Sequence, residues 1–181
     1  LKPVKGAFSV LARRVDDAAT LRAFLASREV REFTEAYLGI FNRLVAGLTD
    51  LDVDGHFFLA EELLSVTLVT VEGFAVDGAV EILGVVDSGL DPATKSFVRF
   101  DYPSALPAHV QDRLADVARR VVRELGLDRT LFNIEMLFDE ASDRIAIIEG
   151  HPRPYGQYAD AYQQVDGTSG YEIALALATG E

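Results

Sequence analysis

The dipeptide Asp77-Gly78 separates two long, mostly apolar segments, residues 57–76 and residues 79–89. Asp-Gly favours a two-residue hairpin turn, because both central positions of that turn need a positive φ angle. The sequence therefore predicts two antiparallel strands joined at this turn, and a short strand within residues 97–107 adds to them. We expect the chain to be built around an antiparallel sheet.

A second predicted hairpin lies closer to the C-terminus. Its strands are residues 131–139 and 144–150, and the polar residues 140–143 lie between them. Between the two hairpins, apolar residues recur with helical spacing from His109 to Leu125. Gly126 follows at the position where a glycine commonly ends a helix, so this segment is predicted to be a helix that packs against the sheet.

The N-terminal part of the chain has a different pattern. Residues 1–15 are consistent with two short strands around a turn at Lys5-Gly6, and residues 17–28 and 29–48 have helical patterns. The chain therefore divides near residue 57 into a small helical part and a larger part rich in strands. A last helix is predicted over residues 170–179.

The charge of the chain excludes several classes of function. Of its 181 residues, 17 are Lys or Arg and 29 are Asp or Glu, which gives a net charge of −12. A nucleic-acid partner or an anionic membrane would require concentrated positive charge. The chain contains no cysteine, which excludes disulfides, thiolate zinc sites and a thiol nucleophile. It has no apolar run near 18 residues and no signal peptide, so a cytoplasmic protein is expected.

The second predicted hairpin carries a candidate metal site. Glu135 is out of phase with the apolar residues of its strand, so it should lie on the face away from the core. If the turn contains an odd number of residues, such as 141–143, Glu135 faces Glu149 and Asn133 faces His151. Two opposed carboxylates repel each other, and a divalent cation such as Mg²⁺ would remove that repulsion. The alternative is two solvated acids on an exposed face.

The stretch "IIEGHPRPYGQ" places further polar groups at the end of this hairpin. It begins with two isoleucines that look buried and continues to Glu149, His151 and Arg153. Because strand residues alternate between faces, these three side chains share one face if the extended backbone continues through the two prolines. Gln157, Asp160 and Tyr162 follow, and they either face a substrate or pack against the sheet.

The order of these elements resembles the ATP-grasp superfamily along essentially the whole chain. The segment "LKPVKGAFS" is similar to the family's lysine strand and phosphate-covering loop, and "FLAEELL" to the segment that holds adenine. "NIEM" with "IIEGHPRP" is similar to its metal-binding hairpin, and "DGTSGYEIALALATGE" to its closing helix. The resemblance implies an α+β fold, the ATP-grasp fold, in which two α+β lobes with mainly antiparallel sheets hold a nucleotide between them.

The resemblance also implies the role of each lobe. Residues 1–56 would form a partial, lid-like lobe, and residues 57–181 the core lobe with the adenine hinge and the metal hairpin. Lys2 would reach the nucleotide phosphates, and Gly6 and Ser9 would belong to the loop that covers them.

On the same resemblance, Glu61 would begin the adenine hinge. The Glu62 carbonyl and the Leu64 amide would then bind the adenine edge. Two departures from the family pattern affect nucleotide binding. The covering loop has Ala7-Phe8 where more glycine is usual, and Leu68 stands where relatives have an acid that binds ribose.

The metal-binding hairpin departs from the family pattern at one position. The resemblance makes Glu135, Glu149 and His151 the metal ligands, and His151 stands where relatives have Asn. An imidazole suits softer divalent ions better than Mg²⁺, so Mn²⁺ is an alternative metal. Arg153 retains the family arginine, which would hold a phosphate or a developing acyl phosphate and act as a catalytic residue together with Lys2.

Members of this superfamily use ATP to activate a carboxylate as an acyl phosphate and pass it to an amine or a similar nucleophile. The resemblance therefore implies a carbon–nitrogen ligase with small-molecule carboxylate and amine substrates. The alternatives are a nucleotide-binding or scaffolding module without turnover and a phosphotransferase on the same fold. The chain begins at Leu1 without a Met, so an N-terminal domain of the same longer protein is an expected partner, and a homodimer is possible.

Overall fold

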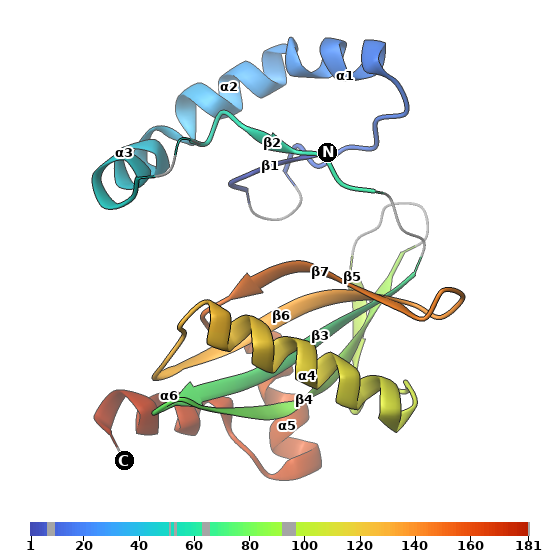
Figure 1. Ribbon diagram of the computed structural model, residues 1–181, viewed down its shortest axis with the longest axis vertical. Coiled ribbons are helices and arrows are strands. Elements are labelled where there is room, and N and C mark those ends of the chain that lie inside the picture. Colours follow the sequence, from blue (N-terminus) through green and yellow to red (C-terminus); the bar gives the residue numbers. More distant parts are fainter. Residues whose placement is uncertain (7–9, 51, 53, 63–65, 92–96, 181) are drawn as a thin grey trace. The chain divides into compact units, whose positions relative to one another are not determined.

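The structure is a computed structural model that describes residues 1–6, 10–50, 52, 54–62, 66–91 and 97–180 (Figure 1). The chain divides into two compact units, Leu1–Leu63 and Leu64–Glu181. Among the described residues, no helix has the length and apolar character needed to cross a membrane.

The first unit combines a two-stranded sheet with three helices. Strand β1 (Lys2–Pro3) pairs antiparallel with β2 (Phe58–Leu59). The helices are α1 (Ala18–Leu25), α2 (Arg28–Ala36) and α3 (Gly39–Leu48). The partner of β1 therefore comes from far along the chain. The predicted second strand within residues 1–15 is wrong for the described residues 10–15, which form a turn followed by irregular backbone.

The ends of these helices explain a second difference from the sequence prediction. Asp17 and Ser27 accept hydrogen bonds from backbone N–H groups of the first turns of α1 and α2, as capping residues do. The single helix predicted over residues 29–48 is wrong, because it is interrupted between α2 and α3. Leu38 is completely buried at the interruption, and the next residue, Gly39, is a weak helix former.

The second unit contains five strands in the order β5-β4-β3-β6-β7, and every neighbouring pair is antiparallel. The strands are β3 (Thr67–Val76), β4 (Ala79–Leu90), β5 (Phe97–Asp101), β6 (Thr130–Asp139) and β7 (Arg144–His151). Asp77 and Gly78 have φ angles of 50° and 81°, which confirms the predicted turn. The long strand predicted over residues 57–76 is wrong, because β2 and β3 are separate strands in different units.

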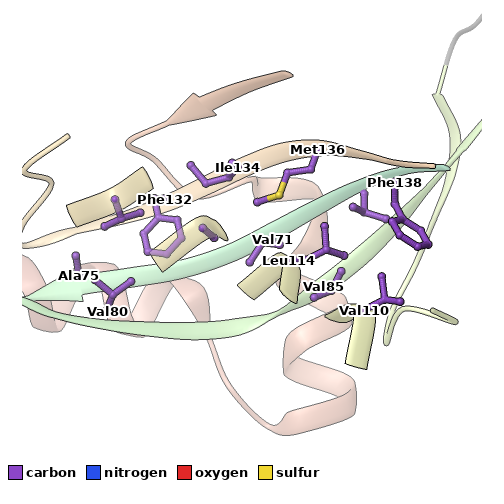
Figure 2. Close-up of a cluster of buried hydrophobic side chains, with 13 residues drawn as sticks. Val71, Ala75, Val80, Val85, Val110, Leu114, Phe132, Ile134, Met136 and Phe138 are labelled. Atoms are coloured by element: carbon purple, nitrogen blue, oxygen red, sulfur yellow. The ribbon is translucent and has the colours of Figure 1, made fainter. Parts of the chain in front are cut away.

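Helix α4 (Ala108–Glu124) covers one face of this sheet (Figure 1). Its apolar residues meet those of three strands in the main core, which Figure 2 shows in close-up. The core comprises Val69, Val71, Ala75, Val80, Val85, Val110, Leu114, Ala118, Val122, Phe132, Ile134, Met136 and Phe138. Gly126 has a φ angle of 63° just beyond the helix, as the sequence predicts for a glycine at this position.

The opposite face of the sheet is covered by elements from the C-terminal region. A short 3₁₀ helix (Gly156–Tyr158) leads into α5 (Ala159–Asp166), and α6 (Gly170–Thr179) follows as predicted. Tyr158 and Tyr162 are buried together with Val86 of β4. Helix α5 was not predicted, because its eight residues contain too few apolar positions to give a clear helical period.

Candidate metal and phosphate site

A β-bulge sets the register of the β6–β7 hairpin. Asp139 pairs with Arg144, so four residues lie between the paired ends, and the condition of an odd-numbered turn is not met. From this turn the pairing continues to Met136 opposite Ile147. The register then shifts by one residue, and Glu135 pairs with Glu149. The bulge, and not the length of the turn, therefore produces the predicted pairing of Glu135 with Glu149. The extra residue in β7 reverses the face to which the side chains beyond it point.

The pairing brings the three predicted metal ligands together. Glu135, Glu149 and His151 each offer one ligand atom, and these atoms lie within 4.8 Å of one another. His151 Nε2 lies 3.2 Å from Glu149 Oε1. Small side-chain movements would let all three reach one cation, and two carboxylates with one imidazole suit a divalent ion such as Mn²⁺ or Mg²⁺. The arrangement fits a metal site, and the ligand roles remain predictions.

Arg153 lies just beyond the end of β7. The strand ends at His151, so the condition under which Glu149, His151 and Arg153 would share one strand face is not met. The isoleucines that precede Glu149 are also less buried than predicted, with Ile147 49% exposed on this edge strand. The guanidinium of Arg153 is exposed to solvent, and its Cζ atom lies 5.7 Å from the ring centroid of Tyr155. An exposed guanidinium two residues after a potential metal ligand is suited to binding phosphate.

Tyr155 adds an aromatic surface to this site. Its ring stacks on that of Tyr158 at a centroid distance of 4.5 Å and an interplanar angle of 22°. Burial raises the pKa of the Tyr155 hydroxyl, the charges of Glu135 and Glu149 raise it further, and Arg153 opposes the rise. The pKa of Tyr155 is therefore sensitive to both acids of the cluster. Sequence reasoning missed this residue, because a tyrosine after a proline-rich turn has no distinctive pattern.

Glu72 of β3 is a buried acid beneath the site. It is only 3% exposed, and its Oε1 atom accepts a hydrogen bond from the Tyr155 backbone N–H at 2.5 Å. Burial raises the pKa of this carboxyl group to about 7, although the Tyr155 hydrogen bond, Tyr162 and the charge of Arg153 oppose the rise. Sequence reasoning missed Glu72 as well. A single acid within the apolar stretch "TLVTVEGFAV" was the available signal.

Two predicted nucleotide-binding residues contact each other in the first unit. Lys2 Nζ lies 3.0 Å from Glu61 Oε2, and both side chains are partly exposed. The contact follows from the pairing of Lys2 with Leu59, because Glu61 lies two residues further along the same chain. The predicted roles of these residues in phosphate and adenine binding remain predictions.

The other residues predicted to bind nucleotide are either exposed or outside the described parts of the chain, and Leu68 marks a departure from the family pattern. Gly6 and Glu62 are exposed. Ser9, Leu64 and the Ala7-Phe8 pair lie outside the described residues. Leu68, at the position where the resemblance places a ribose-binding acid, is buried in β3.

The residues after Arg153 divide into packing and surface groups. Tyr162 is 1% exposed and belongs to the cluster around Val86, which supports the packing alternative for this residue. Gln157 and Asp160 are both exposed. Their proposed contact with an acceptor substrate remains a prediction.

Comparisons with known proteins identify the fold. No family model matches the sequence, and no curated protein matches it either. Among solved structures, biotin carboxylase from Campylobacter jejuni in complex with a β,γ-ATP ligand is similar with a TM-score of 0.72 and 18% identity, over 93% of this chain and 34% of that one. The biotin carboxylase domain of a single-chain bacterial carboxylase has a TM-score of 0.59 and 24% identity, over 68% of this chain and 28% of that one.

A third similar structure is the biotin carboxylase domain of a thermophilic 2-oxoglutarate carboxylase bound to bicarbonate. Its TM-score is 0.58 and its identity 17%, over 84% of this chain and 32% of that one. Biotin carboxylases are ATP-grasp enzymes, and the agreement in fold covers most of this chain. The chain therefore has the ATP-grasp fold that the sequence resemblance implied, and it spans about a third of the length of these structures.

Proposed function

We propose that the chain is the nucleotide-binding and catalytic part of an ATP-dependent ligase that activates a carboxylate as an acyl phosphate. The observation that carries this proposal is the cluster of Glu135, Glu149 and His151, with Arg153 following at the end of the same strand. Three potential metal ligands and a solvent-exposed guanidinium are the groups that phosphoryl transfer needs, because its catalysis depends mainly on positioning and charge stabilisation. The ATP-grasp fold gives independent support.

Each residue has a defined task in this proposal. Glu135, Glu149 and His151 would hold Mg²⁺ or Mn²⁺. The bound ion would neutralise negative charge on the nucleotide phosphates. Arg153 would bind the phosphoryl group during its transfer to the carboxylate, since a guanidinium offers paired donors to phosphate oxygens. Lys2 would bind phosphate oxygens through its compact ammonium charge, and its ion pair with Glu61 would break when it does so.

The acyl phosphate would then be attacked by an amine or a similar nucleophile, with release of inorganic phosphate. The similar solved structures suggest one particular carboxylate, because one of them is a carboxylase domain bound to bicarbonate. We include bicarbonate among the candidate substrates of this protein for that reason. A further domain of a longer protein would contribute to selection of the acceptor.

A nucleotide-binding module without turnover is the second candidate function. It is favoured by Leu68, which is buried and apolar at the position that the resemblance assigns to a ribose-binding acid. His151 in place of an asparagine metal ligand also favours this alternative. The two candidates differ in one measurable property, because only a ligase consumes ATP in response to substrates.

The experiment is release of ADP by the full-length protein with Mg²⁺ or Mn²⁺, using a panel of carboxylates and amines that includes bicarbonate. A ligase gives ADP release that depends on substrate and disappears in Arg153→Ala. Binding of ATP without substrate-dependent ADP release would replace the ligase proposal by the binding module. Absence of ATP binding by a folded protein would contradict both.

A further inference from the structure

The backbone beyond β7 is held by side chains instead of strand pairing. β7 ends at His151, and Pro152 and Pro154 then lack the N–H groups that a strand ladder requires. Asn133 Nδ2 donates a hydrogen bond to the Arg153 carbonyl oxygen at 2.9 Å. Glu72 accepts the hydrogen bond from the Tyr155 N–H at 2.5 Å. The backbone on both sides of Pro154 is therefore fixed by two side chains of the sheet.

Glu72 and Asn133 form one buried unit on the sheet. They pair directly across β3 and β6 and are 3% and 0% exposed. The Asn133 Oδ1 atom is buried and has no hydrogen-bond partner among the described residues. A buried polar atom without a partner destabilises the folded state, and a leucine of similar shape would avoid that cost. The benefit of an asparagine here is its contact with the Arg153 carbonyl.

The fixed backbone controls the surroundings of the Arg153 side chain. The guanidinium of Arg153 lies over the ring of Tyr155, and that ring is stacked on the buried Tyr158. Holding the Tyr155 N–H to Glu72 therefore holds the aromatic surface on which the guanidinium rests. The charge of Arg153 also acts on the pKa of Glu72, so the two groups are coupled electrostatically.

We propose that Glu72 and Asn133 are positioning residues that fix the backbone from Arg153 to Tyr155. By fixing this segment, they direct the Arg153 guanidinium toward a phosphate bound beside the cluster of Glu135, Glu149 and His151. Neither residue contacts the phosphate itself. The phosphate as the target of Arg153 rests on the proposed function, whereas the fixing of the segment rests on the observed hydrogen bonds.

The first test measures the fixed segment without any ligand. The exchange rate of the Tyr155 amide proton is measured by NMR in the wild type, Glu72→Leu and Glu72→Gln. Glu72→Leu removes the acceptor and should accelerate exchange by about tenfold or more, because the Tyr155 amide loses its hydrogen bond. Glu72→Gln keeps an acceptor oxygen and should restore most of the protection of the Tyr155 amide.

Tyr158→Phe is the matched control for this test. It removes the hydrogen bond from Tyr158 to Thr70 on the same sheet face and should leave Tyr155 exchange unchanged.

The second test measures the consequence for anion binding with inorganic pyrophosphate in the presence of Mn²⁺. Glu72→Leu should weaken pyrophosphate binding by about tenfold and leave the affinity for Mn²⁺ alone within about twofold of the wild type. The same substitution is then introduced into Arg153→Ala. A positioning role predicts no further loss in that background, because the group that Glu72 positions is already absent.

Three results would overturn the inference. One is unchanged Tyr155 exchange in Glu72→Leu, another is an equal loss of Mn²⁺ and pyrophosphate affinity, and the third is an equal loss of pyrophosphate affinity with and without Arg153. If Glu72→Leu does not fold, Asn133→Leu takes its place in the same cycle with Arg153→Ala, with the same expected and contrary results. Failure of ATP binding together with the expected pyrophosphate cycle would reject the proposed ligase and leave the positioning role standing.

Discussion

Glu135 and Glu149 face each other across the β6–β7 hairpin, immediately beyond the β-bulge that shifts its register. Without the bulge, Glu135 would face Ile148 and the two carboxylates would lie on opposite faces of the sheet. Like charges directly opposed on one face destabilise a hairpin. The register therefore places two like charges opposite each other, and a cation bound between them would remove their repulsion.

Glu149→Gln should have opposite effects on activity and stability. The substitution removes charge where the metal needs it and should abolish metal-dependent ADP release. Without metal it also removes a cross-strand repulsion, so the free energy of unfolding should stay unchanged or rise by about 0.2–1 kcal/mol. ADP assays and thermal melts of the metal-free protein measure the two effects.

The control for this prediction is Glu140→Gln, the same substitution in the exposed turn of the same hairpin. It should change neither activity nor metal binding. Full activity of Glu149→Gln, or its failure to fold, would contradict the metal role of Glu149 and favour a turn held by ion pairs.

His151→Asn should shift the preference of the site from Mn²⁺ toward Mg²⁺. An imidazole nitrogen favours the later divalent ions, whereas an amide oxygen is the harder ligand that Mg²⁺ prefers. Competition titration measures the dissociation constants for Mg²⁺ and Mn²⁺. Their ratio, Mg²⁺ over Mn²⁺, should be above one in the wild type and should fall toward one in the variant. His109→Asn alters an exposed histidine at the start of α4 and serves as the control. An unchanged ratio in His151→Asn would remove His151 from the ligand set.

The sequence allowed the strands around the site to be predicted because their patterns are local. The Asp77-Gly78 turn, the alternation of β6 and the amphipathic period of α4 each depend on residues that are close together in the chain. The opposition of Glu135 and Glu149 was also predicted. Its cause was not, because no residue pattern in β6 or β7 indicates a bulge.

The supporting contacts could not be predicted in the same way. The hydrogen bond between Glu72 and Tyr155 joins residues that are 83 positions apart, so it depends on how β3, β6 and the C-terminal segment meet. The pairing of β1 with β2 likewise joins the start of the chain to residue 58. Such contacts follow from tertiary packing, which a pattern within one segment does not encode.

Glu61→Ala should weaken binding of ATP by about 1–3 kcal/mol if Glu61 belongs to the adenine hinge, because a buried polar contact to the base would be lost. Calorimetric titration of the full-length protein measures the affinity. The substitution also removes the ion pair with Lys2, which in its partly exposed position should contribute little to stability.

Glu29→Ala is the matched control for Glu61→Ala, since Glu29 forms a comparable exposed ion pair with Arg13 in the same unit. It should leave ATP affinity unchanged. An equal, small change in both variants would reject the hinge assignment of Glu61.

The buried carboxyl group of Glu72 should make the stability of the second unit depend on pH. Burial raises the pKa of this group to about 7 in the folded protein, above the ordinary value of 4.5. The folded state therefore binds the proton more tightly than the unfolded state, and the contribution of Glu72 to stability falls as pH rises from about 4.5 to about 7. Below that window the carboxyl group is protonated in both states, and above it the full cost of burying the charge is present.

Glu72→Gln should remove this dependence while keeping an acceptor for the Tyr155 N–H. Its free energy of unfolding should therefore rise relative to that of the wild type as the pH increases, by up to about 3 kcal/mol between pH 4.5 and pH 8. Denaturant unfolding across this pH range, followed for the wild type, Glu72→Gln and the exposed-site control Glu140→Gln, measures the difference. A difference between Glu72→Gln and the wild type that stays constant with pH would mean that Glu72 is charged in both states at a low pKa. Its burial would then be fully compensated by the Tyr155 hydrogen bond and the nearby guanidinium of Arg153.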